Sequence, residues 1–295
     1  MTRLRPWQGA FLHFLLMVGI AAEPLYAAKY HPVAAAKAPN GSLFVLTAEN
    51  TVFAVNMSLS SGSVAGHFFF RNAGIATDMT YGETAGQGML FIGSNFSTGQ
   101  VVLGRVQEFT TDGKLVQSWT IQHVVAGLTF DPARRTIYFT SGDSPEVYSI
   151  SLQPKSAAHY VAEVTGGSKL GAITIDPSGQ NLYIADVRQG TVFLMSVFTH
   201  RVMQVCQVGT PQALLVNSTD QQLIVADSTR KQVVAFSIVG APGPLRAIAP
   251  AQKFQAPAGL AWWDGAHLLV ADQEMGTISV IDSNTSQFLY SLPLP

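Results

Sequence analysis

The chain has 295 residues, of which 47% are hydrophobic and only 12% charged, and its formal net charge is −1. Soluble domains usually contain about 25% charged residues; polarity here rests instead on Ser, Thr, Gln, Asn and 26 Gly. That mixture suits strands and turns better than solvated helices. There is no basic block to neutralise phosphates, which argues against nucleic-acid binding.

Residues 1–28 are predicted to be a secretory signal peptide. Arg3 and Arg5 give a short positive region, and an apolar run extends from Ala10 to Ala22. This run is shorter than the roughly 20 residues of a membrane span, so cleavage near Ala22 or Ala27 is favoured over an uncleaved anchor. We therefore expect a secreted or periplasmic protein with no membrane span after signal cleavage.

The next feature in chain order is a repeat. Each unit has an apolar strand, an Asp-Pro or Asn-Gly turn, a second strand, a polar turn and a third strand, as in 171-GAITIDPSGQNLYIADVRQGTVFLMS-196. A fourth strand follows at 115–121, 202–208 and 287–293. Four strands in roughly 40–45 residues is the length of a propeller blade. The sequence therefore predicts an all-β, six-bladed β-propeller with four-stranded antiparallel blades.

The propeller is expected to occupy residues 29–295. The predicted blades are approximately 30–72, 73–122, 123–166, 167–208, 209–253 and 254–295. Blade 1 carries an inner strand of its own at 33–38, so the ring could close without a strand from the other terminus. The alternative is that 28–33 adds to blade 6, and the sequence leaves both open.

The unit G-L-x-x-D-P-x-x-x-x-L-Y-I-A-D-x-x-x-x-x-V resembles the NHL repeat and the related repeats of the gluconolactonase–regucalcin group and of strictosidine synthase. The resemblance extends from about Val33 to the C-terminus and is clearest from Ala126. It implies a six-bladed propeller of the calcium-dependent-phosphotriesterase-like superfamily. Hydrolases, lyases and binding modules all use this fold, so the resemblance does not choose a function.

The metal site of this superfamily can be tested on the residues. In its metal-dependent lactonases, Glu, Asn and Asp at the start of inner strands hold a divalent ion, because hard cations need such oxygens. The corresponding positions here are Val33, Thr77, Ala126, Gly171, Gln212 and Ala258. Only Thr77 and Gln212 offer a side-chain oxygen, neither is charged, and Asp78 is one residue out of register. We predict no catalytic residue, no metal site and no cofactor; Ca²⁺ stays open as a cofactor, although these ligand positions do not support it.

Three aspartates recur at the ends of second strands, in LYIAD, LIVAD and LLVAD: Asp186, Asp227 and Asp272. These turns lie on the face where inner strands begin, which is the face that carries ligand sites in this superfamily. Gly190 and Gly276 follow four residues after Asp186 and Asp272. Asp accepts hydrogen bonds from N–H groups two or three residues ahead, so the aspartates are predicted to cap their turns. Thr47, Ser94 and Ser141 take the same place in blades 1 to 3.

Two functions are weighed. The first is a secreted, non-catalytic binding or scaffold module that presents its turns to a protein, peptide or glycan. Its binding-face candidates are Asp143, Glu146, Asp186, Arg188, Asp227, Arg230, Lys231, Asp272 and Glu274. The alternative is a divergent lactonase or esterase-like hydrolase or lyase, with Asp78, Gln212 and Asp272 as channel candidates.

Five N-x-S/T sequons, at Asn40, Asn56, Asn95, Asn217 and Asn284, fall near predicted turns, where a glycan could be accommodated. Such sequons are meaningful only if the protein is not bacterial, which the sequence does not settle. The single cysteine, Cys206, excludes an intramolecular disulfide, and its apolar surroundings predict a buried thiol.

Overall fold

The computed structural model describes residues 30–57, 61–69, 74–153, 155–217, 219, 221–239, 246–249 and 253–294. Within these ranges 24 strands form six separate four-stranded sheets. The predicted signal peptide lies outside the described residues. A search of the described part of the chain finds no helix long and apolar enough to cross a membrane.

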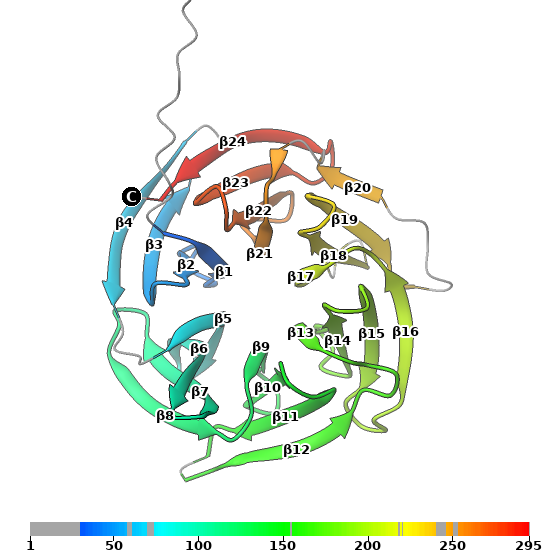
Figure 1. Cartoon of the computed structure of the whole chain (residues 1–295). Helices are drawn as coiled ribbons and strands as arrows, with labels where there is room; N and C mark the ends of the chain where they lie inside the picture. The colour runs from blue at the N-terminus through cyan, green and yellow to red at the C-terminus, as the bar shows by residue number, and fades with distance from the viewer. Residues whose placement is uncertain are drawn as a thin grey trace, which may run out of the picture.

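Each sheet is one blade made of four consecutive antiparallel strands (Figure 1). Blade 1 has β1 (Pro32–Lys37), β2 (Leu43–Thr47), β3 (Thr51–Met57) and β4 (Gly62–Phe69), and blade 2 has β5 (Ile75–Thr84), β6 (Gln87–Thr98), β7 (Val101–Thr110) and β8 (Leu115–Ile121). Blade 3 has β9 (Val125–Asp131), β10 (Thr136–Ser141), β11 (Glu146–Ser151) and β12 (Ala158–Glu163), and blade 4 has β13 (Leu170–Ile175), β14 (Asn181–Asp186), β15 (Thr191–Ser196) and β16 (Val202–Gln207). Blade 5 has β17 (Pro211–Asn217), β18 (Gln222–Asp227), β19 (Gln232–Ser237) and β20 (Arg246–Ala249), and blade 6 has β21 (Pro257–Trp262), β22 (His267–Asp272), β23 (Thr277–Asp282) and β24 (Gln287–Pro293).

The second strand of a blade is its most buried element. In β14, β18 and β22 the five residues that end the strand are all buried, as are all five residues of β2. Such a strand has neighbours on both edges and a blade against each face, so continuous apolar sequence replaces the alternation of a half-exposed strand. The fourth strands are more exposed, as the pattern of β16 shows.

The ring closes by packing of blade 1 against blade 6. Val45 and Phe53 share a buried cluster with Leu269 and Val280 across this junction. In the outer layer, the Tyr290 hydroxyl donates a hydrogen bond of 2.7 Å to the carbonyl of Ser61. Because β1 pairs with β2 of its own blade, closure in the described part of the chain uses no strand exchange between the termini. This answers the question that the sequence left open.

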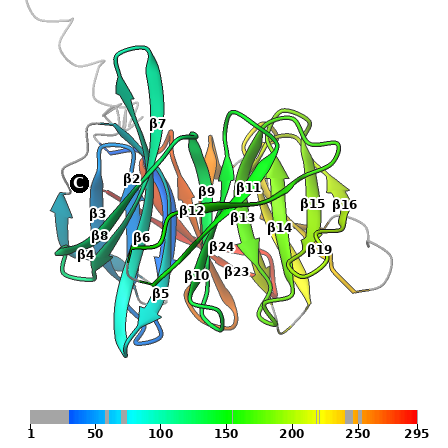
Figure 2. The same ribbon diagram turned by 90° about the horizontal axis from the view of Figure 1, so that it is seen from below.

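The two faces of the disc differ. We call the face where inner strands begin, and where the turns between second and third strands lie, the turn face. Seen from the side (Figure 2), the β6–β7 hairpin extends beyond the other elements of this face. The extension arises because β6 continues to Thr98, four residues past Ser94, which takes the place of the strand-ending aspartates of blades 4 to 6.

Candidate functional site

A cavity of about 960 Å³ occupies the centre of the ring. It is lined by the inner strands of all six blades, which Figure 1 shows facing one axis. Ligand cavities in proteins usually measure about 300–1,000 Å³, so this channel is large enough for a small organic molecule.

Each inner strand is irregular near its start. The pairing with the second strand skips Val33 in blade 1, Thr77 in blade 2, Gln212 in blade 5 and Ala258 in blade 6. Blades 3 and 4 have the same break, at 126–127 and 171–172. A β-bulge redirects a side chain away from the ladder, and all six positions line the channel.

These bulge positions are the ones at which the resemblance to the lactonases places the metal ligands. Four of the six carry Val, Ala or Gly, and only Thr77 and Gln212 carry an oxygen. A calcium ion needs six to eight oxygen ligands, several of them carboxylates, so the residues present do not fit that ion. Among the described residues, no group of three or more His, Cys, Asp or Glu side chains is arranged to hold a metal.

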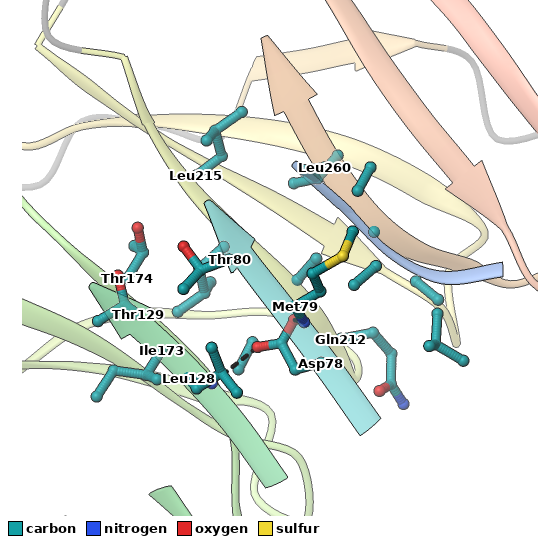
Figure 3. Close-up of a pocket in the computed structure, with 18 of the residues that line it drawn as sticks. Asp78, Met79, Thr80, Leu128, Thr129, Ile173, Thr174, Gln212, Leu215 and Leu260 are labelled. Atoms are coloured by element: carbon teal, nitrogen blue, oxygen red, sulfur yellow. Dashed lines mark hydrogen bonds between the residues drawn. The ribbon is translucent and has the colours of Figure 1, made fainter. Parts of the chain in front are cut away.

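Asp78 stands beside the bulge of blade 2 and lines the channel (Figure 3). Its Oδ1 accepts a hydrogen bond from Met79 N at 2.8 Å, and its Oδ2 accepts one from Leu128 N, also at 2.8 Å. The second bond ties blade 2 to blade 3. Burial in apolar surroundings outweighs these two bonds and raises the pKa of Asp78 from 3.8 to about 7.

The other two channel candidates lie in different places. Gln212 is exposed at its bulge and lines the channel, as predicted from its register. Asp272 does not line the channel, because its carboxylate is fully buried in the turn that ends β22. Asp78 and Gln212 therefore share the cavity, and Asp272 belongs to a different environment.

The channel wall has a polar half that the sequence interpretation missed. Thr80, Thr129 and Thr174 occupy the same place in three successive inner strands, and they appear together in Figure 3. The same place in blades 5, 6 and 1 holds Leu215, Ala261 and Ala36. The signal is visible when the six inner strands are aligned residue by residue, because the three threonine hydroxyls fall at one register position.

Asp186, Asp227 and Asp272 are fully buried. They accept hydrogen bonds from their own turns, as predicted, at 2.9 Å from Arg188 N and Gln189 N, 3.1 Å from Arg230 N and 3.0 Å from Met275 N. Each also accepts bonds from the crossover that enters its own blade. These donors are Ser168 N and Lys169 N for Asp186, Gly209 N and Thr210 N for Asp227, and Gln255 N and Ala256 N for Asp272. One carboxylate thus holds two segments of backbone.

The environment of Asp186 favours its charged form. Burial opposes ionisation, but hydrogen bonds from Gln189, Ser168 and Lys169 outweigh it, so the pKa of Asp186 is lowered below its usual value. Asp186 and Asp78 are both enclosed carboxylates, and their pKa values shift in opposite directions because they differ in the number of N–H donors.

Turn residues next to these aspartates are exposed on the turn face. Arg188, Arg230, Lys231 and Glu274 are all exposed. Lys231 adopts a left-handed backbone conformation (φ 54°) at the place where Gly190 and Gly276 stand in the neighbouring blades. The three turns therefore have a similar shape and carry different side chains. The aspartates contribute to this face by fixing the turns.

Blade 3 carries a polar network on the same face. The Tyr148 hydroxyl donates to Glu146 at 2.6 Å and lies 2.9 Å from His123 Nε2. On its other side, His123 Nδ1 lies 3.9 Å from Asp143. Tyr148 and Ser144 donate hydrogen bonds to Glu146 and lower its pKa. Asp143 and Glu146 were candidates from the sequence, whereas the pair of His123 and Tyr148 was missed because His123 lies in the segment between β8 and β9 and Tyr148 lies in β11.

Comparisons with known proteins support the fold and leave the function open. No family model matches the chain. Protein cueball of Drosophila willistoni is 30% identical over 79 residues, which is 25% of this chain and 12% of that protein. The chain therefore spans a small part of this curated relative.

Three solved structures match most of the chain. A chain of the nidogen/laminin complex superposes with a TM-score of 0.66 and 16% identity, covering 90% of this chain and 94% of that one. Virginiamycin B lyase of Staphylococcus aureus gives a TM-score of 0.61 at 12% identity, covering 90% and 84%. Periplasmic gluconolactonase PpgL of Pseudomonas aeruginosa gives 0.62 at 17%, covering 88% and 84%. The chain is thus a six-bladed β-propeller that matches binding and enzyme propellers alike.

Proposed function

We propose that the protein is an extracytoplasmic, non-catalytic binding module whose turn face recognises a protein, peptide or glycan. The observation that carries the proposal is the construction of the turns in blades 4 to 6. Buried aspartates fix the backbone of each turn by several hydrogen bonds, while side chains that differ from blade to blade stand exposed on it. Pre-organised turns with variable side chains lose little entropy on binding.

The charge of the turn face supports a polar partner. Arg188, Arg230 and Lys231 share the turn face with Glu274 and Asp143, and all five are exposed. Such a mixed surface favours specificity through complementary charges over burial of a large apolar area. One of the matching folds comes from a complex between two proteins, nidogen and laminin. Another is described as periplasmic, which agrees with the predicted signal peptide.

The proposal can be tested with two matched double variants. Arg188→Glu with Arg230→Ala alters the turn face, and Lys114→Glu with Arg201→Ala makes the same kinds of change at exposed residues of the opposite face. Wild-type protein would first be used to isolate a partner from the native source. We expect the turn-face variant to bind that purified partner about tenfold more weakly, and the control to bind within about twofold of wild type. Equal affinity of both variants would place the interaction elsewhere.

A second candidate function, a hydrolase or lyase, has one observation in its favour. Asp78 lines the channel and its pKa is raised to about 7, as is common for catalytic acids and bases. Two of the matching folds are enzymes. The other channel candidate, Gln212, lies across the ring in blade 5 and is uncharged, so Asp78 has no second ionisable candidate beside it in the described part of the chain and we place this function second. Turnover of a lactone or ester by purified protein, abolished by Asp78→Ala, would reverse the order.

A further inference from the structure

Among the described residues, the channel contains one carboxylate, Asp78, that has no ion pair with a cationic side chain. The ionisable side chains that line the cavity are Lys37, Asp78, Tyr81, Lys169 and Asp264. Asp264 is exposed and bonded to His267, and Lys169 is exposed on the turn face. Within the described chain, the hydrogen bonds of Asp78 come from two backbone N–H groups.

Asp78 keeps free capacity to bind a ligand. Each of its two oxygens accepts one of those backbone bonds, and a carboxylate oxygen has two lone-pair positions. Both oxygens therefore have an open position, and the side chain is partly exposed and lines the cavity. This differs from Asp186, where four backbone N–H groups and the Ser168 hydroxyl occupy the carboxylate.

The rest of the channel is suited to a hydrocarbon body. Met79, Leu128, Ile173 and Leu260 line it, as Figure 3 shows. Trp262 adds an aromatic ring and stays in place through a hydrogen bond of 3.4 Å from its Nε1 to the Val216 carbonyl. Apolar walls with a few placed polar groups are typical of small-molecule sites.

We propose that the channel binds a small molecule with one ammonium group on a hydrocarbon body, and that Asp78 is the counter-ion of that ammonium group. An ammonium ion donates up to three hydrogen bonds and would use the open positions on both oxygens of Asp78. The hydroxyls of Thr80, Thr129 and Thr174 supply further acceptors on one wall. An anionic ligand would meet Asp78 without a compensating cation beside it.

The electrostatic surroundings of Asp78 make the proposal depend on pH. Of the elements packed against it, β1 contributes Lys37, β9 contributes Asp131, which is paired with Arg134, and β5 itself contributes Tyr81 and Glu83. Strand β6 contributes no ionisable side chain. Burial outweighs the two backbone hydrogen bonds and raises the pKa of Asp78 to about 7, whereas an alkylammonium ion stays charged below about pH 10. Ammonium binding should therefore strengthen between pH 6 and pH 8.

Calorimetry on the full purified chain with n-octylamine, 1-octanol and octanoate tests the proposal, because the three probes share one hydrocarbon chain. We expect octylamine to bind at least about tenfold more tightly than octanol at pH 8, and octanoate more weakly than both. Asp78→Asn should remove the octylamine advantage and leave octanol binding within about twofold. The control Glu163→Gln removes an exposed carboxylate on outer strand β12 and should leave all three affinities unchanged.

Equal binding of octylamine and octanol by the wild-type protein, tighter binding of octanoate, or no binding of any probe would overturn the proposal. If Asp78→Asn lowers the melting temperature too far for calorimetry, the pH series on wild-type protein decides. Octylamine affinity that does not change between pH 6 and pH 8 then counts against Asp78 as the counter-ion. The turn-face variants leave the channel intact, so the outcome is independent of the proposed partner binding.

Discussion

The crossovers that enter blades 4 to 6 and those that enter blades 2 and 3 are held by different side-chain groups. In blades 4 to 6 a buried aspartate at the end of the second strand holds the crossover that enters its own blade. The crossovers into blades 2 and 3 are held from the preceding blade, by Asn50 and Asn95. The segment entering blade 1 is held by Glu49, which accepts a bond from His31 N at 2.9 Å.

The difference follows from the hydrogen bonds that a carboxylate and an amide can form. A carboxylate only accepts hydrogen bonds and can take several N–H donors, so it can hold a turn and a crossover at once. An amide accepts and donates. Asn95 accordingly pairs with both the N–H and the carbonyl of Val125, each at 2.8 Å. In blades 4 to 6 the turn is fixed from within, and its outer residues are free to vary.

The largest expected effect is the loss of stability when a turn aspartate of blades 4 to 6 is removed. Asp186→Ala removes the acceptor of four backbone N–H groups that are paired in the folded protein. Because unpaired buried donors are costly, we expect the free energy of unfolding to fall by about 3 kcal/mol. Urea denaturation would measure this loss, provided that the slope of the unfolding free energy against urea concentration is unchanged. Asp186→Asn should lose less stability than Asp186→Ala, because one oxygen acceptor remains.

The matched control is Ser94→Ala, which changes the residue at the same place in blade 2. The Ser94 hydroxyl is buried and has no hydrogen-bond partner in the described structure, so its removal should alter stability by less than about 0.5 kcal/mol. Similar losses for Ser94→Ala and Asp186→Ala would show that the aspartate has no special role in the turn.

The next largest expected effect is the loss of stability when the amide that holds the crossover into blade 3 is changed. Asn95→Asp removes the donor to the Val125 carbonyl and places a carboxylate oxygen against it, so we expect a loss of about 2 kcal/mol at neutral pH. Asn284→Asp is the control, because Asn284 is an exposed sequon asparagine in the β23–β24 turn. Equal melting temperatures for the two variants would refute the conclusion that Asn95 holds the crossover into blade 3.

The sequence predicted the repeated part of the molecule well, because strand alternation, Asp-Pro turns and the LYIAD motif are local signals. Capping of the turns by Asp186 and its equivalents was predictable for the same reason. Their second set of bonds, to Ser168 or Gly209, was not, since the crossovers come from a different part of the unit. The role of Asn50 and Asn95 in holding the next crossover was missed, because each side chain contacts the following blade and no local sequence pattern marks such a contact.

The smallest expected effect compares the two enclosed carboxylates through pH. The pKa of Asp78 is raised from 3.8 to about 7, so between these values the folded state holds a proton that the unfolded state has lost. Wild-type stability should therefore fall as pH rises from 4 to 8. For Asp186, whose pKa is lowered, the sign is reversed: its contribution is present above the unfolded value and is lost as the pH falls. A shift of this size in Asp78 corresponds to roughly 4 kcal/mol at most, and solvent in the channel reduces it to about 1–2 kcal/mol. Between pH 4 and pH 8, the stability of Asp78→Asn relative to wild type should thus rise by this amount, as measured by thermal unfolding. If the stability difference between the two proteins does not change with pH, Asp78 titrates as an ordinary exposed carboxylate.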